Sequence, residues 1–247
     1  MMPDIFQRKL DVSDLRKYIQ TQNSNIQKNL YKQCKILLID DKVNDESYPF
    51  TDNINFLRQQ FNCDITTKTD LDNLSDAAGY DIIICDYEGV GIKLRGKMGD
   101  GIWLVKQLQE RYLDKIYILF SSLQFTLRKI KRVKAILWDK KELIRNSEEN
   151  GDGGLTDNIQ DIMKLYADPV KRWEDIRTQL LSLSLSIHEV AKLESAYVGA
   201  IIKKSPQIYS EAMSKVDLAG ENSTDINQYI NSASSIISTI ISLISII

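Results

Sequence analysis

The sequence predicts an α/β fold: a five-stranded doubly wound parallel sheet, preceded by an N-terminal helical arm and followed by an all-α C-terminal domain. Unbroken apolar runs recur along the first half, and such runs are typical of strands buried on both faces of a parallel sheet. Helical patterns separate these runs, as right-handed crossover connections require. Beyond them, residues 157–204 contain few Gly and Pro and have apolar residues at helical spacing.

The first element is an arm, residues 1–32, in which Leu15, Ile19, Ile26 and Leu30 follow roughly helical spacing. Either Asp11 or Ser13 is suited to cap its start. Residues 33–148 then form the predicted sheet domain. Its expected strands are 35–39, 63–67, 81–86, 116–121 and 135–138, and its expected helices are 53–61, 101–112 and 125–133.

The polar, turn-rich segment 146–154 marks a boundary, so residues 149–247 are expected to form the helical C-terminal domain. Pro169 suits the first turn of a helix, and one long helix is predicted from there to about Lys203. Ser205 and Pro206 would open the next helix.

The tail, residues 226–247, has no charged residue and is rich in isoleucine and serine. Four serines lie on one helical stripe, which would allow close approach of helices: Ser235, Ser238, Ser242 and Ser245. A buried helix, within the C-terminal domain or between subunits, is the favoured interpretation. Membrane insertion and a disordered or strand-like tail are the alternatives.

Composition narrows the functional classes. The net charge is −2 and the pI about 5.6, so no overall positive field would attract nucleic acid. A basic stretch, residues 128–134, is expected to be a solvated helix face, because no nucleic-acid-binding motif accompanies it. Three cysteines and the lack of an apolar signal segment favour a reduced, cytoplasmic location.

Polar side chains with matching chemistry end several predicted strands. Asp40 and Asp41 follow the first strand and Asp86 ends the third, while Ser121 ends the fourth and Lys140 follows the fifth. In doubly wound folds, active groups gather at the carboxyl ends of the strands. Three close carboxylates repel one another, and Mg²⁺ is a hard cation that prefers such oxygens. The pattern therefore predicts a magnesium site at this edge.

These residues resemble the receiver domain of two-component response regulators, over residues 33 to about 145. The matching features are the acidic pair Asp40-Asp41, the aspartate ending the third strand, and Asp100-Gly101 opening a helix. The resemblance implies that Asp86 accepts a phosphoryl group from a histidine kinase or a small phosphodonor. It implies Mg²⁺ on Asp41 and Asp86, with Asp40 acting through water.

The resemblance also implies that Ser121 and Lys140 contact the phosphoryl oxygens. Enzymatic activity would be limited to self-catalysed phosphoryl transfer to Asp86. The output would be protein–protein association, with a partner or a second copy, through the C-terminal helices.

The chain also departs from the family. The loop after Asp86 is long, and Glu88 within it places an acid near the phosphorylation site, which would disfavour phosphorylation. No proline follows Lys140, so Lys141 is a rival for the catalytic lysine. The choice of lysine also sets which residue occupies the position of the family's switch aromatic side chain. With Lys141 as the catalytic lysine that residue is Trp138, and with Lys140 it is Leu137.

Three other interpretations stay open. In the first, Asp40, Asp41 and Asp86 are ordinary polar residues at strand ends. In the second, the domain is a pseudo-receiver that acts as an unphosphorylated scaffold. In the third, the tail makes the chain a membrane-acting effector. His188 precedes Glu189, a pattern found in phosphotransfer helices, and is therefore an alternative relay partner for Asp86. The apolar residues around His188 favour instead a largely buried helix.

Overall fold

A computed structural model describes residues 9–122, 133–150, 154–216 and 223–245. The chain divides into two compact units. The first, here called the sheet unit, is Leu30–Tyr166. The second, the helical unit, combines the residues before Leu30 with those from Ala167 onward. These bounds differ from the predicted 1–32, 33–148 and 149–247, because the end of the N-terminal helix and residues 149–166 belong to the sheet unit.

The sheet unit contains a five-stranded sheet in which every pairing is parallel. The strand order is β2-β1-β3-β4-β5, an order consistent with a flavodoxin-like fold. The strands are β1 (Lys35–Ile39), β2 (Asp64–Lys68), β3 (Ile82–Asp86), β4 (Ile116–Ser121) and β5 (Ile136–Asp139). All five predicted strands are present, with bounds that shift by at most one residue.

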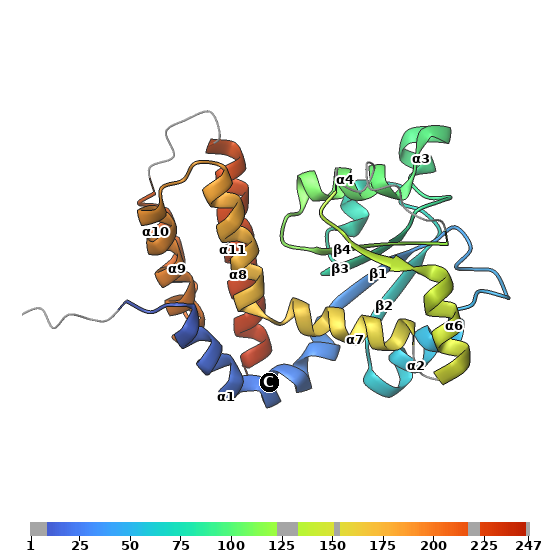
Figure 1. The fold of residues 1–247 in the computed structure, drawn as a ribbon, viewed down its shortest axis with the longest axis horizontal. Helices are drawn as coiled ribbons and strands as arrows, with labels where there is room; N and C mark the ends of the chain where they lie inside the picture. Colours follow the sequence, from blue (N-terminus) through green and yellow to red (C-terminus); the bar gives the residue numbers. More distant parts are fainter. Residues whose placement is uncertain (1–8, 123–132, 151–153, 217–222, 246–247) are drawn as a thin grey trace, which may run out of the picture. The chain divides into compact units, whose positions relative to one another are not determined.

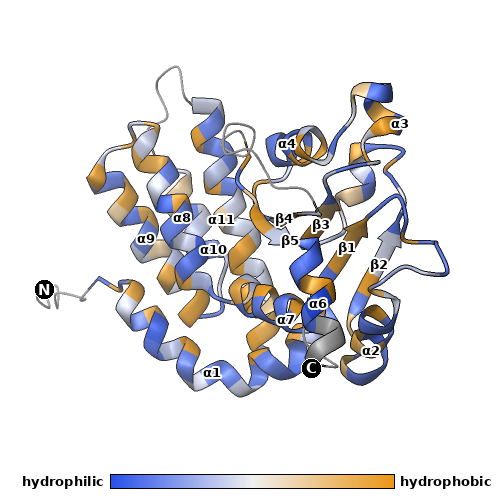
Figure 2. Cartoon of the chain, turned by 45° about the vertical axis from the view of Figure 1, so that its right-hand side comes forward, coloured by the Kyte–Doolittle hydropathy of each residue, from blue (hydrophilic) through white to orange (hydrophobic). Residues whose placement is uncertain are grey.

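Burial follows strand position. Every residue of the central strand β3 is buried, and in β1 only Lys35 is exposed. The edge strand β2 is polar and only partly buried, and Figure 2 shows it paler than the apolar β1 and β3. Apolar runs therefore formed the centre of the sheet, as expected for parallel strands covered on both faces.

Helices cover the sheet (Figure 1). One face carries Leu37, Ile83 and Leu119, and α4 packs against it through Val105 and Leu108. Figure 1 shows α2 and α7 on the other side of the sheet. The helices of this unit are the end of α1 (Val12–Gln33), α2 (Thr51–Phe61), η1 (Leu74–Ala77), α3 (Ile92–Arg95), η2 (Gly96–Met98), α4 (Gly101–Arg111), α6 (Lys140–Asn150) and α7 (Leu155–Tyr166). The predicted helix 125–133 lies, apart from Val133, outside the described residues.

Helix α7 belongs to the sheet unit although its sequence was assigned to the C-terminal domain. Leu155, Ile159 and Met163 on its apolar face are buried. At its start the Asn53 side chain donates to Thr156 Oγ1 (3.2 Å), and at its end the Tyr166 hydroxyl donates to Asp81 (2.6 Å). The boundary predicted at 146–154 therefore falls within the sheet unit, where residues up to Asn150 belong to α6 and α7 begins at Leu155.

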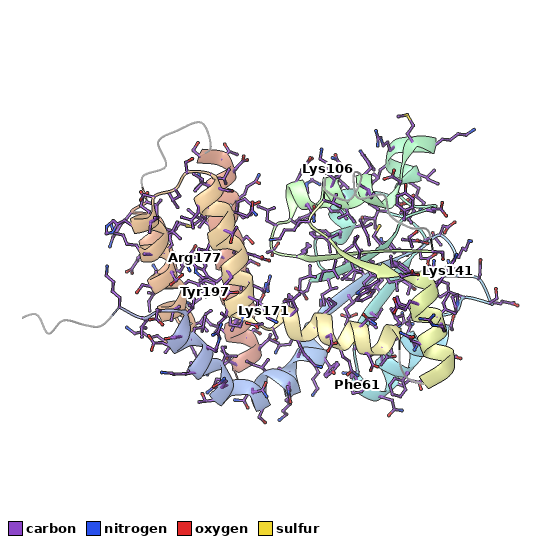
Figure 3. The ribbon with its side chains drawn as sticks, viewed as in Figure 1. Phe61, Lys106, Lys141, Lys171, Arg177 and Tyr197 are labelled. Carbon is purple, nitrogen blue, oxygen red and sulfur yellow. The ribbon has the colours of Figure 1, made fainter. Side chains whose placement is uncertain are left out.

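In its described part, the helical unit contains most of α1 and four further helices: α8 (Pro169–Ser182), α9 (Ile187–Ile202), α10 (Gln207–Met213) and α11 (Ser223–Ile244). Tyr197, labelled in Figure 3, stacks on Trp173 at 4.8 Å between ring centroids, and both rings are fully buried. The nearby hydroxyl of Tyr209 is buried and has no hydrogen-bond partner among the described residues.

The single long helix predicted from Pro169 to about Lys203 is wrong. The chain leaves α8 at Ser182, and Ser184 adopts a positive φ of 71°. A new helix begins after Ser186, whose side chain accepts from the Glu189 N–H while Glu189 accepts from Ser186 in return. This capping box is visible in the sequence as Ser-x-x-Glu and could have located the break. It also gives Glu189 a structural role, and His188 is exposed in the first turn of α9.

The isoleucine-rich tail, as far as Ile244, belongs to α11, which has one face buried. Apart from Ser232, its buried residues are apolar, among them Ile230, Ile237 and Ile240, whereas Ser238 and Ser242 are exposed. The serine stripe is therefore the outer side of an amphipathic helix within this unit, not a surface for close helix approach there. Among the described helices, none is long and apolar enough to cross a membrane.

Candidate functional site

The acidic residues predicted at the strand ends lie together. Ile39 of β1 pairs with Cys85 of β3, so the next residues on the two strands, Asp40 and Asp86, face the same edge of the sheet. Asp41 completes the group: one carboxylate oxygen from each of the three lies within 4.8 Å of the others. We call Asp40, Asp41 and Asp86 the acidic cluster.

Asp40 is completely buried and both of its oxygens accept hydrogen bonds. Its Oδ1 accepts from the backbone N–H of Lys42 (3.0 Å). Its Oδ2 accepts from the Tyr48 hydroxyl (2.9 Å) and from Lys140 Nζ (2.7 Å). A buried carboxylate requires such compensation, because desolvation of an unpaired charge is costly.

Lys140 lies between two acids. Its Nζ is 2.7 Å from Asp40 Oδ2 and 2.8 Å from Asp86 Oδ2, and only 11% of its side chain is exposed. The ammonium also lies 4.8 Å from the centroid of the Phe120 ring, a favourable cation–π distance. Burial lowers the pKa of Lys140, but the hydrogen bonds to Asp40 and Asp86 outweigh that effect and raise it. These three residues form a buried ion triad.

In the acidic cluster, the carboxylates of Asp86 and Asp41 both have a pKa above the usual value. Burial raises the pKa of Asp86, although the hydrogen bond from Lys140 opposes this effect. Asp86 Oδ1 also accepts from the Tyr87 N–H (2.7 Å). Asp41 is exposed, yet partial desolvation of its carboxylate and the adjacent charge of Asp40 raise its pKa. Crowded negative charge of this kind is relieved by a cation.

The remaining predicted residues occupy different environments. Ser121 is buried at the end of β4, one residue beyond Phe120, which pairs with Asp86. Lys141, labelled in Figure 3, is exposed at the start of α6, so Lys140 is the lysine that contacts the acids. Trp138 is buried in β5, whereas Leu137 is 39% exposed. Glu88 is exposed in the loop after Asp86.

Two glycines lie in close contact with residues of the acidic cluster, one with a backbone carbonyl and one with a side chain. A Cβ on Gly101 would lie 2.0 Å from the carbonyl oxygen of Asp86, and a Cβ on Gly89 would lie 2.3 Å from Asp41 Cγ. Gly89 also has a positive φ of 74°. The Asp-Gly pair at the start of α4 thus has a steric reason as well as a capping one, since Asp100 accepts from the Trp103 N–H (2.7 Å).

Tyr48 and Gly89 were not predicted as part of the site from the sequence. Tyr48 lies in a polar segment before α2, where no periodic pattern predicts burial, yet it is 5% exposed. Gly89 lies in the long loop after Asp86, and its local sequence does not mark it as a neighbour of the acidic cluster. Its proximity to Asp41 depends on the path of the whole loop.

The residues present fit a hard divalent cation. The acidic cluster offers carboxylate oxygens from three residues, the donor type that Mg²⁺ prefers, and one of the three side chains is open to solvent. Asp41 and Asp86 are the residues that would hold the ion, because Asp40 is fully buried and already accepts three hydrogen bonds, whereas Asp86 accepts two.

The chain was compared with models of known protein families and with curated proteins. Neither comparison found a match. The case for function therefore depends on the geometry of the acidic cluster.

Replacing Tyr48 with phenylalanine is expected to lower the free energy of unfolding by about 1.5–3 kcal/mol, the range for hydrogen bonds to charged groups. The lost bond is the one from the hydroxyl to Asp40 Oδ2, which is buried. Urea unfolding, monitored by tryptophan fluorescence, measures the change. Tyr209→Phe is the matched control, because it removes a buried hydroxyl without a partner among the described residues and should be neutral or stabilising. Equal losses in both variants would contradict the assigned role of Tyr48.

Proposed function

We propose that the sheet unit is a doubly wound, receiver-like domain that accepts a phosphoryl group on Asp86 with Mg²⁺, and that it regulates association through the helical unit. The observation that carries the proposal is the acidic cluster with Lys140 on Asp86. The ligand oxygens lie within 4.8 Å of one another, and Lys140 Nζ is 2.8 Å from Asp86 Oδ2. In this proposal the donor is a histidine kinase or a small acyl phosphate.

The reaction is a displacement at phosphorus. An oxygen of the Asp86 carboxylate attacks the phosphoryl group, and a new P–O bond forms as the bond to the leaving group breaks. Acetyl phosphate releases acetate, and a phosphohistidine releases its imidazole, which then takes up a proton. Bound Mg²⁺ would neutralise charge on the transferred oxygens.

The chain's own residues would complete the site. Lys140 can pair with a phosphoryl oxygen in exchange for its bond to Asp86, while it keeps its bond to Asp40. Ser121, at the end of the neighbouring strand, would donate its hydroxyl to another. These groups are positioned before the reaction, the condition under which electrostatic stabilisation is most effective.

Beryllofluoride binding tests the proposal, because this anion imitates a phosphoryl group on a carboxylate in the presence of Mg²⁺. We expect the full chain to bind it, as a new protein-bound ¹⁹F resonance that requires Mg²⁺. Asp86→Asn should lose the resonance. Asp81→Asn is a control carboxylate at the opposite end of β3, where it accepts from the Lys35 N–H and from Tyr166. A resonance that persists in Asp86→Asn would refute the assignment.

One observation favours a second candidate, an unphosphorylated scaffold that keeps the receiver-like architecture. Lys140 already bridges Asp40 and Asp86, so each of these two buried carboxylates has a cationic partner without a metal ion. In that case Mg²⁺ and beryllofluoride would leave both the ¹⁹F spectrum and the oligomeric state unchanged.

A further inference from the structure

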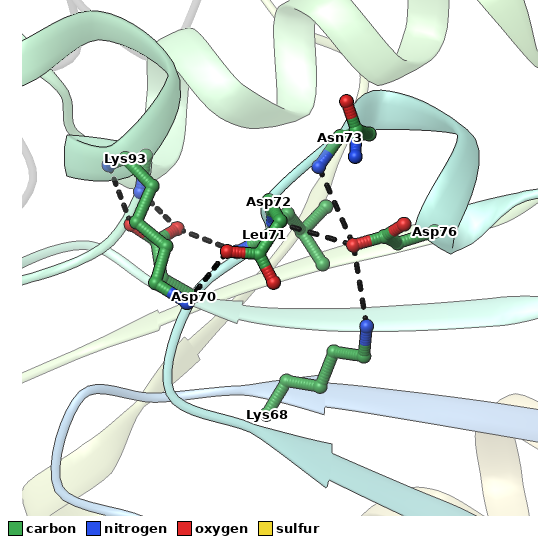
Figure 4. A network of polar contacts seen from close by, with 8 residues as sticks. Lys68, Asp70, Leu71, Asp72, Asn73, Asp76 and Lys93 are labelled. Atoms are coloured by element: carbon green, nitrogen blue, oxygen red, sulfur yellow. Dashed lines mark hydrogen bonds and ion pairs between the residues drawn. The ribbon is translucent and has the colours of Figure 1, made fainter.

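A fourth aspartate, outside the acidic cluster, binds the loop that follows Asp86. Asp70 comes two residues after β2 and is only 7% exposed. Its Oδ1 accepts from the N–H of Leu71 (2.8 Å) and of Gly91 (2.7 Å), and its Oδ2 accepts from the N–H of Lys93 (2.9 Å). Figure 4 shows these bonds joining the segment after β2 to the start of α3.

The loop that Asp70 binds is the long one, residues 87–99, by which this chain departs from receiver domains. Gly91 and Lys93 lie at its centre, two and four residues after Gly89. Neighbouring Val90 is fully buried, so the loop is attached to the unit from its first half onward. An exposed ion pair, Lys93 Nζ to Asp72 (2.9 Å), adds a second and weaker connection.

The same loop contacts the acidic cluster. Gly89 lies so close to Asp41 that an added Cβ would be 2.3 Å from its Cγ. Asp41 is the one member of the cluster with an exposed side chain. The position of Gly89 therefore limits the orientations open to Asp41.

We propose that Asp70 is a positioning residue: it holds the 87–99 loop against Asp41 and thereby sets the cation affinity of the acidic cluster. This inference depends on the proposed function, since it concerns the same cation. Residues that orient ligands without touching the ion commonly change affinity about 10- to 100-fold. A buried carboxylate that accepts three backbone N–H groups is well suited to this role, because charged acceptors make the stronger hydrogen bonds.

The test compares Asp70→Asn with Asp76→Asn in the full chain. Asparagine keeps the volume of Asp70 but loses the charge and one acceptor oxygen. Asp76 is the matched control: it accepts from Lys68 Nζ (3.2 Å) and from the N–H groups of Asp72 (3.2 Å) and Asn73 (3.3 Å), in the same network. None of these bonds reaches the 87–99 loop (Figure 4).

Two readouts are needed, Mg²⁺ affinity by titration calorimetry and hydrogen exchange of the Gly91 and Lys93 amides. We expect Asp70→Asn to weaken Mg²⁺ binding about tenfold and to speed exchange at both amides, since outer contacts control ligand placement. Asp76→Asn should bind Mg²⁺ like the wild type.

The outcomes separate the two proposals. If the wild type binds Mg²⁺ and Asp70→Asn binds it equally well, the positioning role is refuted and the proposed function stands. Equal weakening by both variants also refutes it, because the effect would then be general loosening. If the wild type binds no Mg²⁺, the proposed function fails and this inference fails with it.

Discussion

Gly89→Ala is expected to weaken Mg²⁺ binding by roughly 100-fold or more, beyond the usual effect of changes next to metal ligands. The new Cβ would lie 2.3 Å from Cγ and 2.4 Å from Oδ2 of Asp41, so either the carboxylate or the loop must move. Because Asp41 is a proposed ligand, its displacement removes an oxygen from the cation. Titration calorimetry with Mg²⁺ measures the loss directly.

Gly96→Ala separates this steric effect from backbone strain. Gly96 has a φ of 70°, close to the 74° of Gly89, but a Cβ there would meet nothing within 4 Å. Both variants should lose about 1–3 kcal/mol of stability, because an alanine is strained at a positive φ. Only Gly89→Ala should lose Mg²⁺ affinity. If the two variants bind the ion equally, contact between Gly89 and Asp41 has no part in the site.

Lys140→Met is expected to lower the free energy of unfolding by about 3–5 kcal/mol, the range for breaking a buried ion pair. Methionine keeps the apolar stem but removes the ammonium, which leaves Asp40 and Asp86 without their shared cation. The deficit should be among the largest for any single substitution in the sheet unit. Chemical denaturation at neutral pH, without divalent cations, measures it.

Lys141→Met is the control for this variant. Lys141 is exposed and its side chain makes no ion pair among the described residues, so its replacement should change stability by less than about 0.5 kcal/mol. If Lys141→Met were the more damaging variant, the assignment of Lys140 to the triad would be wrong.

The pH dependence gives a further check on Lys140. Its pKa is raised above the ordinary 10.5, so the stabilisation that it provides is complete below that pH. The stabilisation is lost as the pH rises through the folded-state pKa. The difference in stability between wild type and Lys140→Met should therefore be constant from neutral to mildly alkaline pH and shrink above it.

The strands and the acidic cluster could be predicted because both depend on local sequence. A parallel strand buried on both faces needs an unbroken apolar run, and Asp40, Asp86 and Ser121 each stand at the end of such a run. Parallel topology then brings those ends to one edge. The sequence alone could not decide between Lys140 and Lys141. The two are adjacent, so a shift of one residue exchanges them, and the proline that usually follows the lysine in receiver domains is absent.

The supporting residues could not be predicted, because their roles depend on how distant segments meet. Asp70 is an ordinary polar residue in the sequence, and only the path of the 87–99 loop brings Gly91 and Lys93 to it. Tyr48 likewise needs the fold around Asp40 to explain its burial. The assignment of α7 failed for a similar reason, since its apolar face predicts burial but not the surface that covers it.

Direct trapping of a phosphoryl group on Asp86 is the measurement that tests the account most directly. The full chain would be incubated with acetyl phosphate and Mg²⁺, reduced with borohydride and mapped by peptide mass spectrometry. An acyl phosphate on aspartate is reduced to homoserine, whereas an unmodified aspartate is not. We predict homoserine at position 86, dependent on Mg²⁺ and absent without acetyl phosphate. Unmodified Asp86 under these conditions, or homoserine at another aspartate in its place, would contradict the account.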